Sequence, residues 1–273
     1  MCIYARNGYG ERIYIYSVKT STDYKKAILV RCSISEGNEE LMYNVDNGKK
    51  KCCGYLGHAN DMTFLEAGKT DYLYVVTKKE SNYGLIKLAI TDNTYKKVGE
   101  YNFKLNGTPR GIAGIDIMKS DSTTINFLLK SGNDFYTAKL KKSATKGTIN
   151  LTKYFTINVK EANVNGKICD LSSYKPQGFC YSKNKIYVPL TKGNVSYVLT
   201  YENIDNVKND PEDPLKSGTD SFRITSKKYS KLFEIESVAI QNKKLYFSYN
   251  SKKEGAAVQD FDAVAYFKGF EEK

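Results

Sequence analysis

The sequence contains a single histidine, His58, and none of its six cysteines forms a CxxC pair. Zinc sites draw their ligands from clusters of cysteine and histidine, so this pattern argues against a zinc site. No apolar run approaches the roughly 18 residues that a transmembrane helix needs, which excludes such a helix. A strand-like pattern starts at Met1, so we expect no signal peptide within the chain.

Common catalytic motifs are missing as well. The chain has no phosphate-binding loop and no dinucleotide-binding glycine motif. It also lacks the GxSxG nucleophile elbow, so His58 has no motif partner for a Ser-His-Asp triad. Arginine is rare among the basic residues, although arginine forks are the preferred groups for specific phosphate recognition.

The composition favours β-structure and a basic surface. The 23 tyrosines, together with many Val, Ile and Thr residues, favour strands over helices. The formal net charge is 42 − 30 = +12, which attracts polyanions such as teichoic acid, anionic lipid or nucleic acid. Because the lysines are scattered, a solvated lysine surface explains most of this charge. Lysines and aromatics do interleave, as in 101-YNFKL-105, but strands alternate in this way anyway, so nucleic acid is not an expected partner.

The chain repeats one pattern four times: a polar residue, a small or acidic residue, an apolar alternation, a turn and an aromatic-rich strand. The starts of the repeats are about 50 to 67 residues apart, which is close to the roughly 50-residue period of some propeller blades. Asn184 and Asn242 occupy the turns of the last two repeats, and asparagine tolerates the positive φ of tight hairpins. The segments are 60-NDMTFLEAGKTDYLYVVT-77, 110-RGIAGIDIMKSDSTTINFLLK-130, 177-QGFCYSKNKIYVPLT-191 and 236-ESVAIQNKKLYFSYN-250.

Further strand-like runs follow each segment, among them 85–91, 98–105, 135–142 and 154–160. Cys52 and Cys53 are expected in a polar loop after 48-GKKK-51. About four strands per repeat are typical of a β-propeller, and a β-sandwich would not require similar hairpins at near-constant spacing. We therefore predict an all-β fold, a five-bladed β-propeller of about four antiparallel strands per blade, in a single domain over residues 1–273. The expected blades are 1–50, 58–105, 110–160, 177–226 and 236–273.

The last expected blade lacks its outer strand. Propellers commonly close when a strand from the other terminus completes the last blade, which removes exposed edges. We therefore expect the chain to be a trimmed piece of a longer protein, whose missing N-terminal residues complete this blade.

Polar residues start the inner strands of the expected blades, where side chains reach the mouth of the central channel. They are Asn60, Arg110, Gln177 and Glu236, with His58 and Asp61 beside the first of them. An amide, a guanidinium and a carboxylate in one ring could bind a polar ligand such as a sugar, and these six residues are the predicted ligand-binding set. Alternatively, each side chain only satisfies backbone groups at a tight turn.

Catalysis is a second interpretation of the same residues. Two carboxylates across a channel can hydrolyse a glycosidic bond, and Asp61 and Glu236 are the candidates, with Asp116 also available. Five-bladed glycosidases usually show three acidic residues at the blade starts, whereas this chain offers two. Asn60, Asp61 and Glu236 also carry the oxygen ligands that calcium prefers. No other metal and no cofactor is expected.

The repeat motifs resemble those of a known group of proteins. The segments 57-GHANDMTF-64, 176-PQGFCYS-182 and 236-ESVAIQNKKLYFSYN-250 are similar to five-bladed propellers of the helveticin J-like group. That group in turn resembles the phage receptor-binding and teichoic-acid-biosynthesis-protein-C-like propellers. The resemblance extends loosely over the whole chain and implies binding of a cell-envelope glycopolymer, in a bacteriocin-like or wall-associated protein of Gram-positive bacteria. It supplies no catalytic set.

These observations favour a module that binds a cell-envelope glycan or another polyanionic polymer at the propeller axis. Two alternatives stay open: a glycoside hydrolase or lyase that uses axial carboxylates, and a structural or interaction scaffold. The sequence favours binding over catalysis without deciding between them. The expected partner is a cell-surface polysaccharide or a teichoic-acid-like polymer, and the expected state is a monomer. The expected location is secreted or wall-associated, with a cytoplasmic location also open.

Overall fold

The computed structural model describes residues 2–6, 12–33, 39–67, 70–79, 82–208, 210, 213–255 and 261–272. Within these ranges the regular structure is β, apart from two single-turn 3-10 helices, η1 (Val45–Asn47) and η2 (Ile204–Asn206). Neither helix combines the length and the apolar character that crossing a membrane requires. The all-β prediction is confirmed.

The chain divides into two compact units. Unit 1 comprises Met1–Leu129 and Ala138–Thr152, and unit 2 comprises Lys130–Thr137 and Lys153–Lys273. Strands β13 (Thr124–Ser131), β14 (Asp134–Lys141) and β15 (Lys146–Thr156) each pass from one unit to the other. The prediction of one domain with five blades stays a prediction.

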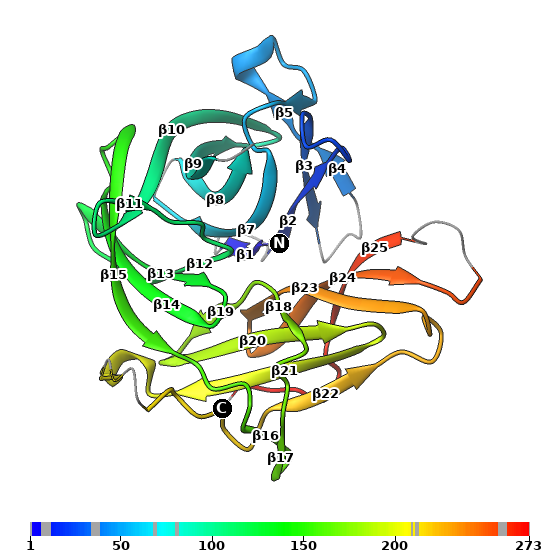
Figure 1. The fold of residues 1–273 in the computed structure, drawn as a ribbon. Coiled ribbons are helices and arrows are strands. Elements are labelled where there is room, and N and C mark those ends of the chain that lie inside the picture. The colour runs from blue at the N-terminus through cyan, green and yellow to red at the C-terminus, as the bar shows by residue number, and fades with distance from the viewer. Residues whose placement is uncertain are drawn as a thin grey trace. The chain divides into compact units, whose positions relative to one another are not determined.

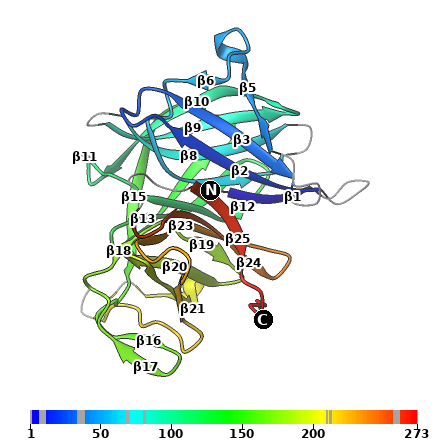
Figure 2. The ribbon, with the colours of Figure 1, turned by 90° about the vertical axis from the view of Figure 1, so that its right-hand side faces the viewer.

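The first sheet of unit 1 is formed by consecutive antiparallel strands, which Figure 2 shows running side by side. They are β1 (Cys2–Arg6), β2 (Arg12–Thr20), β3 (Ala27–Ser33) and β4 (Glu39–Leu41). A short strand, β6 (Cys52–Cys53), pairs with the start of β3. The expectation of a polar loop at Cys52 and Cys53 is therefore wrong, because pairing with β3 carries Cys53 into the core, where it is 4% exposed.

The second sheet of unit 1 contains a meander of four long strands (Figure 1). They are β7 (His58–Leu65), β8 (Asp71–Lys79), β9 (Asn82–Thr91) and β10 (Thr94–Leu105). The order β12-β13-β14-β15 continues the sheet beyond β10, where β12 is Gly114–Ser120. Two short strands, β5 (Tyr43–Asn44) and β11 (Thr108–Pro109), also pair with β10.

Strand β15 differs from its expected range. It begins at Lys146 and ends at Thr156, whereas the sequence pattern predicted a strand over 154–160. The earlier start comes from a parallel pairing of Lys146–Leu151 with Glu100–Leu105 of β10. Residues 146–148 are exposed and polar, so their sequence carries no apolar alternation that could have indicated a strand.

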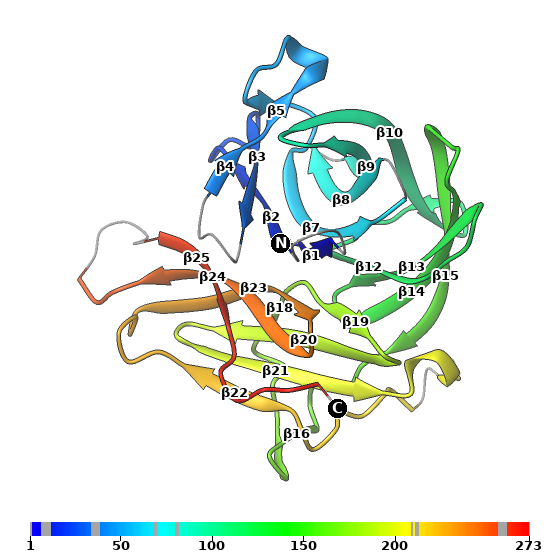
Figure 3. The ribbon, with the colours of Figure 1, turned by 180° about the vertical axis from the view of Figure 1, so that it is seen from behind.

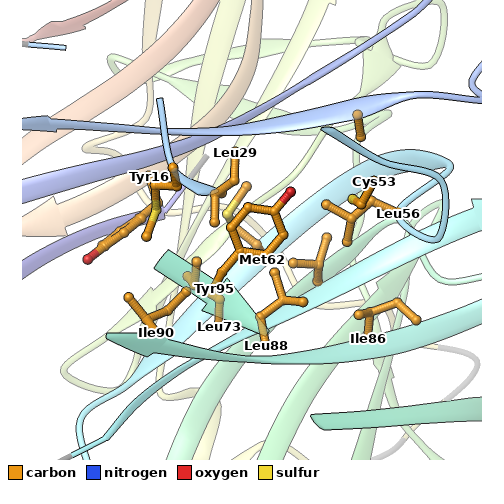
Figure 4. Packing of buried hydrophobic residues seen from close by; sticks show 13 residues of the cluster. Tyr16, Leu29, Cys53, Leu56, Met62, Leu73, Ile86, Leu88, Ile90 and Tyr95 are labelled. Carbon is orange, nitrogen blue, oxygen red and sulfur yellow. The ribbon is translucent and has the colours of Figure 1, made fainter. Parts of the chain in front are cut away.

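A hydrophobic cluster fills unit 1 between the first sheet and the β7–β10 meander (Figure 4). Leu73 pairs with Leu88 across β8 and β9, and both side chains are fully buried. Tyr16 and Leu29 come from the first sheet and pack against the same cluster. Burial of each such side chain contributes about 1.5–3 kcal/mol to stability. The cluster therefore holds β7 in place, and β7 carries several of the candidate site residues.

Unit 2 contains two main antiparallel sheets. In one of them, β20 (Lys185–Lys192), β21 (Val195–Glu202) and β22 (Phe222–Thr225) run side by side, as Figure 3 shows. Asn184 and Lys183 have positive φ in the β19–β20 turn, as do Asn242 and Lys243 in the β23–β24 turn. The prediction of tight turns at the two asparagines is confirmed. The strands are β16 (Ala162–Val164), β17 (Lys167–Cys169), β18 (Lys175–Pro176), β19 (Cys180–Ser182), β20 (Lys185–Lys192), β21 (Val195–Glu202), β22 (Phe222–Thr225), β23 (Leu232–Gln241), β24 (Lys244–Lys252) and β25 (Phe261–Tyr266).

Candidate functional site

Two of the aligned strand positions carry the same backbone irregularity. The pairing of β7 with β8 shifts register just before Asp61, so Asn60 is the extra residue of a β-bulge. The pairing of β23 with β24 shifts just before Ser237, so Glu236 is the extra residue there. A bulge bends the strand and re-aims a side chain, and bulges are over-represented next to active sites. Asn60 and Glu236 are thus equivalent in backbone geometry as well as in the repeat pattern.

In unit 1, the Asp61 carboxyl is almost completely buried. Its side chain is 2% exposed, and its Oδ2 accepts a hydrogen bond of 3.2 Å from the backbone N–H of Ile115. Burial raises the pKa of Asp61 to about 6, because water no longer stabilises the carboxylate. Hydrogen bonds from the Ile115 and Met62 backbones oppose this rise, and the nearby charge of Asp116 adds to it.

Asp116 is the second carboxyl of this part of unit 1, and it lies on β12. Its Oδ1 accepts hydrogen bonds of 2.8 Å from the Thr63 hydroxyl and from the backbone N–H of Ile117. Thr63 and Asp61 lie two residues apart on β7. Asp61 and Asp116 therefore form a carboxyl pair that is held by β7 and β12 and is largely engaged by backbone and hydroxyl donors.

His58 and Asn60 lie at the solvent side of the same strand. The His58 ring is exposed, its Nδ1 forms a hydrogen bond with Asn60 Oδ1, and it makes an edge-to-face contact with Tyr24 at 4.7 Å between centroids. The Asn60 amide donates to the carbonyl of Ile112 at 3.2 Å. The backbone N–H of Arg110 donates to the carbonyl of Phe103 in β10, which extends the antiparallel pairing of β10 with β11 by one residue.

In unit 2, Glu234 and Glu236 of β23 form a second carboxyl pair. Glu234 Oε1 accepts a hydrogen bond of 2.6 Å from the Gln177 amide and lies 3.8 Å from Lys175 Nζ. Glu236 Oε1 accepts a hydrogen bond of 2.5 Å from the Asn250 amide. Burial, and then the negative charge of Glu234, raise the pKa of Glu236 to about 7, against a smaller opposing effect of Lys175.

Several contacts hold Gln177 in front of this pair. The Lys130 side chain is fully buried, and its ammonium group donates to the Gln177 carbonyl. The backbone N–H of Gln177 donates to the carbonyl of Pro189 at 3.0 Å, and the N–H of Gly178 donates to the carbonyl of Glu236 at 3.1 Å. The backbone of Gln177 is therefore held at both its N–H and its carbonyl. This fixes the position from which its side chain reaches Glu234.

The two units divide the predicted ligand-binding set. His58, Asn60, Asp61 and Arg110 belong to unit 1, and Gln177 and Glu236 belong to unit 2. In unit 1, Asn60 is hydrogen-bonded to His58. In unit 2, Gln177 is hydrogen-bonded to Glu234, which lies beside Glu236. The single axial ring of six residues stays a prediction.

Sequence reasoning missed Glu234, Lys175 and Asn250 as members of the site. A signal for Glu234 was present, because 234-EIE-236 places two carboxylates two residues apart in a strand, where alternate side chains share a face. Lys175 gave no local signal, since only the fold brings it to Glu234. Asn250 is the cross-strand partner of Glu234 in the β23–β24 hairpin, so the turn at Asn242 was a signal for it.

No group of three or more His, Cys, Asp or Glu side chains in the described ranges is arranged to hold a metal ion. The expected absence of a cofactor and the calcium alternative both stay predictions. In each carboxyl pair, the partners that the structure shows are amides, hydroxyls, backbone N–H groups and one lysine.

Comparison with known proteins shows a likeness in structure alone. No protein-family model matches the sequence, and no curated protein matches it. Three solved structures are similar: a GH43 β-xylosidase/α-arabinofuranosidase from a compost microbial metagenome, a β-xylosidase named RS223, and a proposed glycoside hydrolase from Bacteroides ovatus ATCC 8483.

The first has a TM-score of 0.52 at 10% identity over 97% of this chain and 89% of that chain. The second has a TM-score of 0.52 at 10% identity over 98% and 91%. The third has a TM-score of 0.54 at 11% identity over 97% and 85%. Likeness at such low identity shows the fold and nothing further, and the conclusion is that the chain has the β-propeller fold of these proteins.

Proposed function

We propose that the chain is a glycoside hydrolase in which Glu236 is the proton donor. The observation that carries the proposal is the Glu234–Glu236 pair, in which burial and a neighbouring carboxylate raise the pKa of a bulge residue. Hydrolysis of a glycosidic bond requires a carboxylic acid with a raised pKa to protonate the leaving oxygen. A pKa of about 7 leaves a substantial fraction of Glu236 protonated near neutral pH.

The partners of Glu236 suit this role. Asn250 holds one carboxyl oxygen, and Gln177 and Lys175 hold Glu234 as the charged neighbour. Once Glu236 has given up its proton, the negative charge of Glu234 favours its return from solvent. Each of these residues lies on a strand or directly beside one, which fixes the geometry better than a loop would.

The structural neighbours support the substrate class. Their names describe a β-xylosidase/α-arabinofuranosidase, one of whose structures contains xylotriose, and a β-xylosidase. We therefore infer that the substrate is a glycan, and we take xylosides and arabinofuranosides as the first compounds to test.

Asp61, the other carboxyl that the sequence singled out, belongs to unit 1 and is assigned no step of the hydrolysis. Its carboxyl is buried and accepts a hydrogen bond from the Ile115 backbone, so it suits a structural role better than proton transfer during turnover. The Asp61→Asn variant tests this assignment independently of Glu236.

Aryl glycosides with different leaving groups test the role of Glu236. Glu236→Gln should lower kcat by about 10²–10⁴-fold on a substrate with a poor leaving group, because such a group needs protonation. The loss should be much smaller with 2,4-dinitrophenol as leaving group, which departs as an anion. Glu202→Gln, an exposed carboxyl in the same unit, is the matched control and should keep wild-type activity. Equal losses on both substrates, or no hydrolysis of any glycoside by the wild-type protein, would reject the proposal.

Binding without hydrolysis is the second candidate function. It is favoured by Asp61, whose carboxyl is held by backbone N–H groups, and by the amides of Asn60 inside β7 and of Gln177 just after β18. A wall glycan as ligand, membership of the helveticin J-like group and a secreted or wall-associated location belong to this candidate. Tight binding of a glycan that the protein never cleaves would favour it over hydrolysis.

A further inference from the structure

Unit 2 contains a cavity of about 500 Å³ that the Glu234–Glu236 pair does not line. Its walls come from segments 132–133, 157–160 and 172–176, with Pro214 at one side. The volume lies in the range of roughly 300–1,000 Å³ that is usual for small-ligand sites. Because Tyr174 contributes the aromatic surface of this space, we call it the Tyr174 cavity.

The Tyr174 cavity lies on the opposite side of one chain segment from the carboxyl pair. Lys175 and Gln177 both reach Glu234, whereas Tyr174 and Pro176 line the cavity. Alternate residues of an extended segment point to opposite sides. The segment that positions Gln177 for the carboxyl pair therefore also forms a wall of the cavity, and the two places are distinct.

Backbone hydrogen bonds hold the cavity walls together. The N–H of Ile157 donates to the carbonyl of Asn133 at 3.0 Å, which joins the first two segments. The N–H of Leu171 donates to the carbonyl of Val159 at 2.8 Å, and Tyr174 is tied back to Leu171 at 2.9 Å. A site with such fixed walls loses little conformational entropy when a ligand binds.

The Tyr174 ring is also held in place. It packs edge-to-face against Tyr197 at 5.1 Å between centroids, and Lys192 Nζ lies 5.9 Å from the centre of its ring. Tyrosine offers a large amphipathic contact surface at a low entropic cost, because it has only two side-chain torsions. The amide of Asn133 and the hydroxyl of Ser172 line the same space and supply hydrogen-bonding groups.

The lining chemistry fits a neutral, polyhydroxylated ligand. Among the described residues that line the cavity, Lys160 carries the one formal charge, and it is exposed. The other groups combine an aromatic ring and aliphatic side chains with amides and a hydroxyl. A sugar ring has the matching surface, because its C–H face is apolar and its rim carries hydroxyl groups.

We propose that the Tyr174 cavity is a second carbohydrate-binding site, which holds a neutral sugar unit of the glycan outside the carboxyl site. The choice of a sugar rests on the proposed function. The site increases the affinity for an oligosaccharide or polymer and leaves the cleavage of a small aryl glycoside unchanged. Multivalent contact of this kind strengthens binding without any new contact at the carboxyl site.

Binding of neutral trisaccharides to the Glu236→Gln protein tests the proposal, because that variant cannot use the proposed proton donor. Xylotriose, arabinotriose, cellotriose and N,N′,N″-triacetylchitotriose are the probes, and ligand-observed NMR and calorimetry give the affinity. Adding Tyr174→Ala should weaken binding of the preferred trisaccharide by about tenfold. Adding Tyr174→Phe, which keeps the ring, should leave binding within about twofold. Asn133→Ala, in a different wall segment, should weaken binding too, and thermal melting of each variant checks that unit 2 is folded.

The outcomes separate this proposal from the proposed function. Unchanged affinity in both the Tyr174→Ala and Asn133→Ala variants would overturn the second site, as would failure of all four trisaccharides to bind. Tyr174-dependent binding in a protein that hydrolyses no aryl glycoside would support the second site and reject the role of Glu236. Hydrolysis that depends on Glu236, together with trisaccharide binding that does not depend on Tyr174, would support the role of Glu236 and reject the second site.

Discussion

At the scale of single residues, Asp61 and Glu236 share a raised pKa and differ in their hydrogen-bond partners. Burial raises the pKa of both carboxyl groups, so both resist ionisation. The Asp61 carboxyl accepts a hydrogen bond from the Ile115 backbone, whereas Glu236 accepts from the side chain of Asn250 and lies beside Glu234. This difference in partners, more than the pKa, selects Glu236 as the group that exchanges a proton.

The raised pKa of Asp61 predicts that stability falls as the pH rises. The folded protein holds this proton up to about pH 6, whereas the unfolded chain releases it near the ordinary value of 3.8. The unfolding free energy should therefore decrease from about pH 4 to pH 6, and the contribution of Asp61 is on the order of 3 kcal/mol. The raised pKa of Glu236 lowers the unfolding free energy with rising pH in the same way.

Urea unfolding at a series of pH values should show a flatter curve of unfolding free energy against pH for Asp61→Asn than for the wild type or for the exposed control Glu254→Gln. Parallel curves would contradict the prediction.

At the scale of strands and turns, the sequence pattern located the hairpin turns of the last two repeats. Asn184 and Asn242 were expected in tight turns, and both have positive φ. The pairing of β6 with β3 and the parallel pairing of β15 with β10 were not foreseen. Hairpin turns depend on a few neighbouring residues, whereas these pairings depend on partners far along the chain, and short polar strands carry no alternation to indicate them.

Gly57, just before β7, provides a test of how that strand is seated. Its φ is +52°, and a Cβ there would lie 2.4 Å from the carbonyl oxygen of Lys78. Gly107 also has positive φ, at +81°, but a Cβ there meets nothing within 4 Å. Gly107→Ala should cost about 1–2 kcal/mol of unfolding free energy for the left-handed backbone alone. Gly57→Ala should cost about 4 kcal/mol or more, because β7 must also move away from β8. Similar midpoints for the two variants in urea would show that the close approach does not exist.

At the scale of the whole molecule, the net charge of +12 bears on partners and not on the fold. The fold comes from the strand repeats, and the comparison with solved structures shows it as a β-propeller. The count of five blades stays a prediction. The charge predicts attraction to anionic polymers, while the proposed sites bind neutral sugars, so the two kinds of binding should respond differently to salt.

Salt should separate these two kinds of binding. Association with polyglutamate should weaken at least about tenfold between roughly 0.05 and 0.3 M NaCl, because counterions screen exposed lysines. Binding of a neutral trisaccharide and hydrolysis of an aryl glycoside should change little over that range. Calorimetry and activity measurements in the same buffers give both responses. A neutral trisaccharide whose affinity falls as steeply as that of polyglutamate would contradict the assignment.

The sequence by itself determined the all-β character, the repeat of hairpins and the equivalence of Asn60 and Glu236 in the repeat pattern. These features are local, since side-chain alternation and turn residues act over a few positions. The expectation that both residues start their strands is wrong, because β7 begins at His58 and β23 at Leu232. Only the tertiary structure brought Lys175 and Gln177 to Glu234, divided the predicted ring between two units and formed the Tyr174 cavity from three segments. Their burial and charge environment arise from strand pairing between distant residues, which no local pattern in the chain encodes.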